Sequence, residues 1–466
     1  MNRLLFFMIT LCITCTALAE PWMASRFSQN CAGCHTPGRR NVVAEDRRCS
    51  LSCQGCHVNP NGGGLRNAYG KWTSKRFLRS FQNDFFKDSE RPAPTAIQQA
   101  AKKAAAPKNY QVQTSENPHL DEAAYLRDKR EFQIVSEAEY LSDIPVDDPY
   151  YLNRQEIQGG FDVRFMNIHR EATDENTSFL MAADFGLAYK PIQHVNFVYE
   201  SRLLGRYTGN PLDEQIDQFI TESLYLLVDD LPYNSFAMTG YYRPLFGNDH
   251  PDHTRISRSI IAKAATGNSR GYYSLRYKAA SVGTAPNVPY LNLHYLHNQV
   301  DASDPINDTQ GIVANAGLRF VSYGASINYS FWQQKRPEED GEDARTLMHN
   351  LYLTSTLWTN RLHLGLEGMV AQVERDNIFT SVSVWTLESY YRFYREAYLA
   401  AEFASANATV EFNPGSTTQL KLGIKWFIVP GVELLSQYVK DASNSTSALE
   451  QDRTREYLST HIHLYH

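Results

Sequence analysis

Cysteine is missing from most of this 466-residue chain, and the few cysteines present are crowded near its start. Apart from Cys12 and Cys15, all of them lie between Cys31 and Cys56, and none follows. A small secreted domain held by disulfides would spread paired cysteines along its length. The crowding excludes a disulfide scaffold for the remainder and indicates a compact N-terminal module followed by a cysteine-free body.

Long apolar runs are also missing. The opening stretch, MNRLLFFMITLCITCTALAEPW, has a basic start, a short apolar run and small residues at Ala17 and Ala19, a pattern that predicts a signal peptide and a mature chain from Glu20. No later stretch offers about 18 uncharged apolar residues, which argues against helical membrane spans. A membrane protein built of β-strands remains open.

Charge divides the chain at the same place. Residues 20–80 hold ten basic side chains against three acidic ones, whereas the chain after residue 110 holds 29 basic and 45 acidic ones. Between the two lies SERPAPTAIQQAAKKAAAPKNYQVQTSENP, whose Ala, Pro, Gln and Lys are typical of a linker, with a plug segment as the alternative. Opposite charges of this size favour contact between the module and the body.

Beyond about Gln155 the hydrophobic period becomes two. Leu420, Leu422 and Ile424, for example, alternate with Lys421, and similar segments of roughly ten residues recur. Tight turns such as YKPIQH, WTNRL and IVPGV separate longer polar loops such as RYTGNPLDEQI, PLFGNDHPDHTRISRS and QQKRPEEDGEDAR. A soluble sandwich shares the alternation, but short turns on one side and long loops on the other are typical of outer-membrane barrels.

The number of strands follows from counting back from the last one, REYLSTHIHLYH. The count is about 16, with a first strand near QEIQGGFDVRFMN, and the ambiguous stretches 131–140 and 270–280 leave it open by two. His461 and His463 share a face of the last strand that should point into the lumen. There they line a polar interior, which we favour, or ligate a haem.

Two C-x-x-C-H strings, CAGCH and CQGCH, contain the residues predicted to bind cofactors. The residues predicted to bind two c-type haems are Cys31, Cys34 and His35 in the first string and Cys53, Cys56 and His57 in the second. Covalent attachment needs two thiols on one side of the porphyrin and an imidazole on the next turn as the iron ligand, which fixes the spacing. Disulfides or zinc would use the same residue types, but two complete strings favour haem.

Cys49 is left over by this assignment. With Cys53 and Cys56 it has the C-x3-C-x2-C spacing of radical enzymes that hold a four-iron cluster, but those need a reducing compartment and a large α/β domain. Its role stays open between a packing residue, an intermolecular disulfide and an unusual haem ligand.

The glycine-rich NPNGGGLRNAYG after His57 is predicted to be a loop over a haem face, because glycine lets the backbone approach a flat surface. It lacks the context of a phosphate loop.

Distal iron ligands are scarce. Between residues 20 and 118, Met23 is the only methionine, and the only histidines are those of the two strings. The module alone therefore cannot give both irons a sixth His or Met ligand. Either Met23 completes one iron and His119 or a lumen-facing barrel histidine completes the other, or one iron has an open site.

A signal peptide, an N-terminal C-x-x-C-H module and a C-terminal barrel together resemble the fused cytochrome-porins of iron-oxidising bacteria. The resemblance implies that a haem domain docks in a single-chain barrel and carries electrons across the outer membrane. CHVNPNGGGLRNAYG and LPYNSFAMTGYYRPLFGNDHPDHT are also similar to segments of cytochrome-linked outer-membrane proteins. This sequence departs from the family in having two haem strings and the Cys49 extension.

The predicted fold class is mainly β: an outer-membrane antiparallel β-barrel of about 16 strands with a small N-terminal dihaem c-type cytochrome module. The predicted domains are a signal peptide over 1–19, the module over 20–87, a linker or plug over 88–130 and the barrel over 131–466. The module is expected in the periplasm or in the barrel lumen.

The leading functional hypothesis is an electron conduit, with electron transfer favoured over conversion of a substrate. Because the hydrocarbon core is about 30 Å thick, two haems in a small module do not span it, which implies a periplasmic cytochrome as a partner. A metal ion such as iron, or another redox partner, is expected outside, and no nucleic acid is. Two alternatives remain: a solute-transporting porin with a haem sensor or tether, and a haem enzyme with an open iron site.

Overall fold

The computed structural model describes three residues near the haem strings, Val58, Asn59 and Leu65, and most of the chain from Ile157 to Tyr465. In that second part the described ranges are 157–170, 172–192, 194–205, 216–231, 235–247, 255–266, 275–284, 290–299, 307–320, 325–337, 343–357, 362–375, 378–394, 397–408, 415–429, 431–445 and 453–465.

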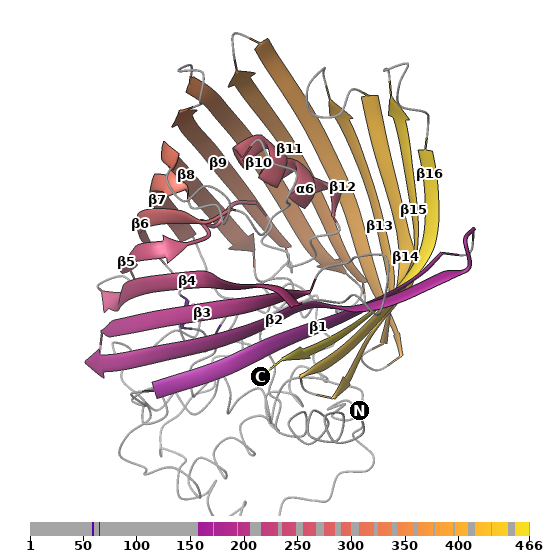
Figure 1. Cartoon of the computed structure of the whole chain (residues 1–466), viewed down its shortest axis with the longest axis horizontal. Helices are drawn as coiled ribbons and strands as arrows, with labels where there is room; N and C mark the ends of the chain where they lie inside the picture. The colour runs from indigo at the N-terminus through magenta and orange to yellow at the C-terminus, as the bar shows by residue number, and fades with distance from the viewer. Residues whose placement is uncertain are drawn as a thin grey trace, which may run out of the picture.

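The described part of the chain forms a closed antiparallel barrel of sixteen strands (Figure 1). The strands are β1 (Ile157–Arg170), β2 (Glu175–Ile192), β3 (Val195–Gly205), β4 (Ile216–Leu231), β5 (Ser235–Tyr242), β6 (Tyr277–Thr284), β7 (Tyr290–Gln299), β8 (Asn307–Phe320), β9 (Ala325–Pro337), β10 (Asp343–Leu357), β11 (Leu362–Arg375), β12 (Ile378–Tyr394), β13 (Ala397–Ala408), β14 (Gly415–Val429), β15 (Val432–Ser445) and β16 (Arg453–Tyr465). Each strand pairs with its neighbours in sequence, and β1 pairs with β16, for example Asp162 opposite Tyr465, which closes the ring.

The predicted strand count and the predicted position of the first strand are confirmed. The ambiguous stretch 270–280 contains the start of β6 at Tyr277. The ring is closed by strands from Ile157 onward, and residues 131–156, which the sequence assigned to the barrel, lie outside the described residues.

The alternation in the sequence places apolar residues outside and polar residues inside. On β7, Leu291 and Leu293 are 52% and 45% exposed, whereas Asn292 between them is 1% exposed. On β14, Leu422 is exposed and Lys421 is buried. A soluble sandwich would bury the apolar face, so the inverted arrangement identifies a barrel of the outer-membrane type with a lipid-facing exterior and a polar lumen.

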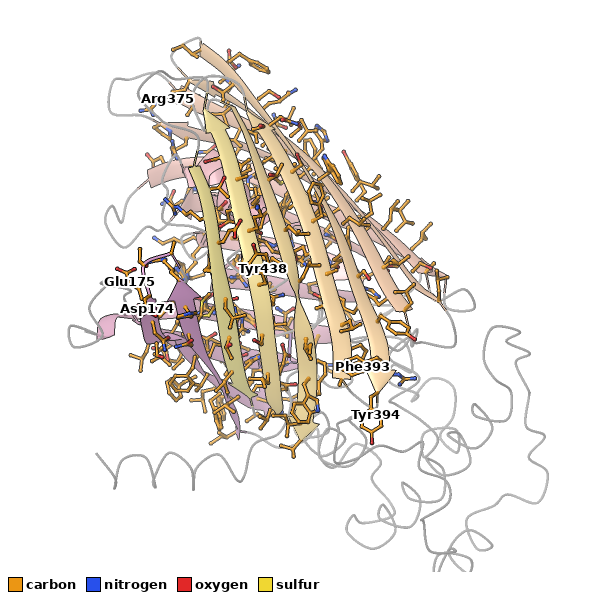
Figure 2. All side chains as sticks on the ribbon, turned by 90° about the vertical axis from the view of Figure 1, so that its right-hand side faces the viewer. Asp174, Glu175, Arg375, Phe393, Tyr394 and Tyr438 are labelled. Carbon is orange, nitrogen blue, oxygen red and sulfur yellow. The ribbon has the colours of Figure 1, made fainter. Side chains whose placement is uncertain are left out.

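Connection lengths distinguish the two ends of the barrel. Connections at one end are short, such as 193–194 and 430–431, and those at the other include 206–215 and 243–276. Short turns face the periplasm in barrels of this type. Figure 2 shows Phe393 and Tyr394 at the end of the short turns, where both are exposed and suit an interfacial aromatic girdle.

Two of the long polar loops differ from the prediction. QQKRPEEDGEDAR continues β9 and β10 beyond their apolar parts, and cross-strand pairs such as Lys335–Asp343, at 2.5 Å, reduce the loop to 338–342. PLFGNDHPDHTRISRS, predicted to be a loop outside the barrel, has its described residues in the lumen, because the β5–β6 connection contains α6 (Ile256–Thr266), which lies inside the ring of strands (Figure 1). No helix in the described part of the chain is long and apolar enough to cross a membrane.

Candidate functional site in the barrel lumen

All the predicted ligands of the haems lie outside the described residues: Cys31, Cys34, His35, Cys53, Cys56, His57, Met23 and His119. The described residue nearest to them is Val58, which follows His57 directly in the sequence. Val58 is therefore the described residue from which the neighbourhood of the second C-x-x-C-H string is considered.

Val58 and Leu65 both pack on the inner wall of the barrel. Val58 is 5% exposed and Leu65 4%, and both belong to an apolar cluster that includes Ala188 of β2 and Val198 of β3. The Val58 amide donates a hydrogen bond to the Leu65 carbonyl at 2.9 Å. The loop predicted for NPNGGG lies, apart from Asn59, outside the described residues.

Gly186 and Glu200 form the seat of Leu65. A Cβ on Gly186 would stand 3.3 Å from Leu65 Cδ1, so the leucine would have to move by a few tenths of an ångström to admit one, and a larger side chain would occupy its place. The Leu65 amide donates to Glu200 Oε1 at 3.4 Å, and the other carboxylate oxygen accepts a hydrogen bond from Ser223. Both seat residues lie about six positions from the short-turn ends of β2 and β3, in the periplasmic half of the lumen.

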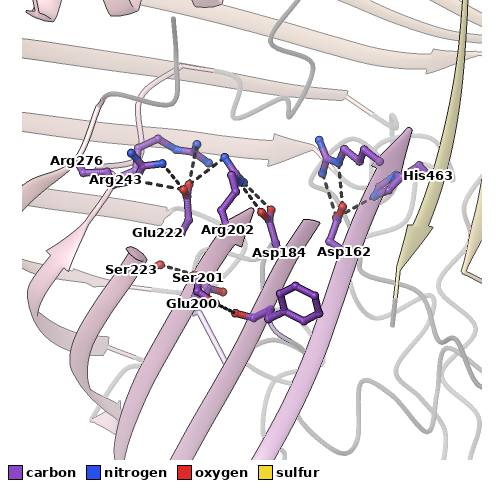
Figure 3. Close-up of polar contacts among 12 residues, drawn as sticks. Asp162, Asp184, Glu200, Ser201, Arg202, Glu222, Ser223, Arg243, Arg276 and His463 are labelled. Atoms are coloured by element: carbon purple, nitrogen blue, oxygen red, sulfur yellow. Dashed lines mark hydrogen bonds and ion pairs between the residues drawn. The ribbon is translucent and has the colours of Figure 1, made fainter. Parts of the chain in front are cut away.

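A row of charged side chains crosses the inner wall from β6 to β1 (Figure 3). Glu222 on β4 accepts from Arg276 and lies 3.4 Å from Arg202 Nη1 and 3.5 Å from Arg243 Nη1. Arg202 also donates to Asp184 on β2 at 2.6 Å. Burial of these charges is compensated by pairing, and removal of one partner would leave another charge uncompensated.

The same row continues across the β1–β16 seam. Asp162 accepts from Arg164 Nε at 2.9 Å and lies 2.8 Å from His463 Nε2. His463 Nδ1 lies 3.8 Å from Glu433, which pairs with Lys425 at 2.7 Å. His463 therefore lines the polar lumen, as favoured from the sequence.

Helix α6 is fixed against the opposite wall by arginine. Arg255, 1% exposed, donates to Glu388 on β12 and lies 2.9 Å from Glu402 on β13. Glu388 also accepts from Tyr352 at 2.6 Å, and Glu402 lies 3.2 Å from Lys421. The lumen is thus narrowed by a helix held through an ion-pair network.

Close apolar contacts support the same segment. Phe246 packs edge-on against Trp332 at 5.5 Å between ring centroids, and the Gly247 amide donates to Ser330 Oγ at 2.9 Å. Gly247 has φ +65°, and a Cβ there would stand 3.0 Å from Asn350 Nδ2. A residue with a side chain would be strained at this position.

His294 on β7 is a buried histidine of another kind. It is 1% exposed, and no described residue offers either ring nitrogen a hydrogen-bond partner. Its ring lies 5.9 Å from the ring of Tyr242, which lies 5.9 Å from Tyr225. His294 is not among the residues predicted to form a site, although the pattern YLNLHYLHNQ predicts that it faces the same side as Asn292, which is the lumen.

Asp162, Asp184, Glu222, Glu388, Glu402 and Glu433 are paired with arginine, lysine or histidine, whereas Glu200 accepts from Ser223 and the Leu65 amide. Among the described residues there is no cluster of three or more His, Cys, Asp or Glu side chains that could hold a metal ion. The described lumen therefore offers paired charges, an apolar seat for Leu65, and the buried imidazoles of His294, His363 and His463.

Comparisons with known proteins identify the fold only. No family model and no curated protein matches the chain. It is similar to an anion-selective porin from Comamonas acidovorans (TM-score 0.51, 11% identity, 66% of this chain and 99% of that one). It also matches the outer membrane channel DcaP of Acinetobacter baumannii (TM-score 0.49, 9% identity, 67% and 98%) and the outer membrane protein OmpT of Vibrio cholerae in its trimer form (TM-score 0.49, 8% identity, 66% and 99%). The first of these shows a shared outer-membrane-type β-barrel fold.

Proposed function

We propose that this chain is an outer-membrane electron conduit in which a dihaem module is held at the periplasmic side of the barrel lumen. The observation that carries the proposal is the burial of Val58 against the inner wall, because this residue is bonded to His57 of the second haem string. A periplasmic module tethered only by a linker would leave the residue beside His57 free of the barrel.

The two C-x-x-C-H strings and the barrel have separate roles in the proposed conduit. Cys31, Cys34 and His35 hold one haem, and Cys53, Cys56 and His57 hold the other. When bound, a c-type haem supplies a one-electron couple whose potential depends on its axial ligands and its burial. The barrel provides passage through the lipid, and the seat at Gly186 and Glu200 fixes the position of the second string.

A periplasmic cytochrome and an extracellular redox partner complete the proposed route. The module is small against a hydrocarbon core about 30 Å thick, and its seat lies in the periplasmic half of the lumen. Electrons therefore need a soluble carrier on the inner side, and a donor or acceptor that approaches through the outer half, for which ferrous iron is the first candidate.

The experiment follows the visible haem spectrum of the full-length protein in oriented proteoliposomes. A membrane-impermeant redox reagent, and then ferrous iron, is added at the face that corresponds to the cell exterior. Prompt oxidation or reduction of the haems is expected. A response that appears only after the vesicles are lysed would exclude the conduit.

A matched pair of glycine variants tests the docking. Gly186→Leu fills the space occupied by Leu65 and should slow the response to the external reagent while the barrel still assembles. Gly368→Leu is the control, because a Cβ on Gly368 meets nothing within 4 Å. An equal effect of both variants would contradict the proposed seat.

A solute-transporting porin is the second candidate, and the polar lumen favours it. That function predicts steady ion conductance across a planar bilayer by the protein with both haems in place. A conduit with its lumen occupied by the module and by α6 should conduct little until the module is displaced, as in Gly186→Leu.

A further inference from the structure

A row of polar side chains crosses the outer surface of the barrel on β6, β7, β8, β9 and β10, which are consecutive along one wall (Figure 1). Each residue of the row is paired in register with the next: Lys278 with His297, His297 with Gln310, Gln310 with Lys335, and Lys335 with Arg345. All five side chains are exposed, whereas the residues before and after each of them in the chain are buried or half-buried, so the five point outward. We call this row the outer belt.

The outer belt lies at the edge of the lipid-facing surface. Two positions nearer to the short turns, the same face carries mostly apolar or aromatic residues, namely Ala280, Tyr295, Ile312, Gln333 and Leu347. Two positions nearer to the long connections, it carries Asp308 and Asp343. Because long connections face the cell exterior in barrels of this type, the belt lies where the acyl chains of the outer leaflet end and the headgroups begin.

Three of the five belt residues are cationic, and their charges are only weakly engaged. Lys278 forms no ion pair within the part of the chain that the structure describes. Lys335 pairs with Asp343 at 2.5 Å, and Arg345 lies 3.9 Å from Glu374. Both pairs are exposed, and exposed ion pairs are weak, so the two cations remain able to bind another anion.

The belt is confined to one part of the circumference. On β12, β13 and β14 the halves nearer to the long connections, residues 378–387, 403–408 and 415–420, contain no Asp, Glu, Lys or Arg. Their outward polar side chains are hydroxyls and amides, such as Ser383 and Asn407. Since such residues suffice for a hydrophilic rim, the cations of the belt indicate a partner of opposite charge.

The spacing of the cations suits two anionic groups on one lipid. Lys278 and Lys335 are three strand spacings apart, about 14 Å along the wall, and Arg345 lies one spacing beyond Lys335. Lysine and arginine both bind phosphate, and His297 and Gln310 between them offer hydrogen bonds to hydroxyl groups. A headgroup with phosphates at the two ends of a disaccharide has this arrangement.

We propose that the outer belt binds a glycolipid of the outer leaflet whose disaccharide headgroup carries a phosphate at each end. One phosphate lies beside Lys278, and the other lies beside Lys335 and Arg345. The acyl chains extend over the apolar surface at Tyr295 and Ile312, which are 51% and 46% exposed. The inference needs only the folded barrel and is independent of the haems.

Native mass spectrometry of the full-length protein with added lipid tests the assignment. The probes are diphosphoryl lipid A, its monophosphoryl form and phosphatidylglycerol, and the wild type should bind the diphosphoryl form most tightly. Lys278→Gln combined with Lys335→Gln and Arg345→Gln should weaken this binding about a hundredfold, because each basic side chain beside an anionic lipid surface contributes about fivefold.

Two single variants control for the loss of charge. Lys440→Gln removes an exposed lysine from β15, where Lys440 pairs with Glu456 at 2.6 Å, and it should leave the affinity unchanged. Lys278→Arg should bind as the wild type does, because the guanidinium keeps the charge and bonds to phosphate. Heat-modifiable migration on gel electrophoresis shows that each barrel is folded.

The outcomes that overturn the proposal are distinct. Equal affinities of the wild type and the triple variant would do so, as would an equal loss in Lys440→Gln and Lys278→Gln. Equal binding of phosphatidylglycerol and diphosphoryl lipid A would show a general attraction for anionic lipid in place of a headgroup site. Displacement of the lipid by inorganic phosphate alone would show that the site takes free phosphate. A protein without haem would overturn the proposed function and leave this assignment intact.

Discussion

Replacement of Arg255 by methionine should release α6 from the barrel wall. Arg255 is 1% exposed and contacts the carboxylates of Glu388 and Glu402, which are themselves buried. Breaking a buried ion pair by removing one partner costs about 3–5 kcal/mol. The lower end applies here because Glu388 keeps its hydrogen bond from Tyr352 and Glu402 keeps Lys421.

A loss of about 3 kcal/mol corresponds to a shift of roughly a hundredfold in the equilibrium between the docked and released segment. Trypsin cleavage after Lys263 of α6 reports that equilibrium, because cleavage follows the population of the open form when opening and closing are fast. The rate of cleavage in the folded barrel should rise by about this factor, and ion conductance should rise with it.

Two controls test the reasoning behind this number. Arg255→Lys keeps the charge but loses the two-sided guanidinium contact, so an intermediate rate is expected. When Arg255→Met is combined with Glu388→Gln, the loss of docking free energy, and with it the rise in cleavage rate, should be smaller than in Arg255→Met alone. The reason is that the double variant removes one uncompensated carboxylate. A cleavage rate in Arg255→Met within twofold of the wild type would refute the role of this network.

Two predictions concern the wall itself. Asp162→Asn should lower the temperature at which the heat-modifiable band unfolds on gel electrophoresis, because Asp162 joins β1 to His463 of β16 across the seam, while Asp308→Asn at an exposed site should not. Gly423→Ala should hinder assembly of the barrel, because its Cβ would stand 2.1 Å from the backbone carbonyl oxygen of Ser436. Gly368→Ala is the control, because a Cβ on Gly368 meets nothing within 4 Å. Equal yields of folded barrel from the two variants would contradict the prediction and show that the backbone near Gly423 shifts to admit a Cβ.

The barrel was predictable because its signals are local. Alternation along each strand is read within about ten residues, and turns such as IVPGV mark strand ends in the sequence. The 16 strands and the start near Gln155 follow from counting alone. Strand ends were less accurate, since polar pairs such as Lys335–Asp343 extend strands beyond the apolar face.

The inward fold of the β5–β6 connection was not predictable in this way. Its hydrophilic first half is typical of an outer loop, and the residues that hold it, Glu388 and Glu402, lie more than 130 positions later in the chain. The sequence did contain a signal, because Arg255 and Arg258 lie three residues apart with Ile256 and Ile261 alongside. Arginines among isoleucines at helical spacing indicate a helix that is buried and paired.

The opposite charges of module and body suggested that electrostatic attraction holds them together, but the lumen provides little free charge for it. Glu222 is surrounded by three arginines, and Glu433 lies beside Lys425 and His463, so the described wall compensates these acids itself. Attraction between exposed charges is also weakened beyond about 8 Å at physiological salt. The contact that Val58 and Leu65 make with the wall is instead mainly apolar. Burial of Leu65 closely against Gly186 fixes a position, which a diffuse attraction between charged surfaces does not do.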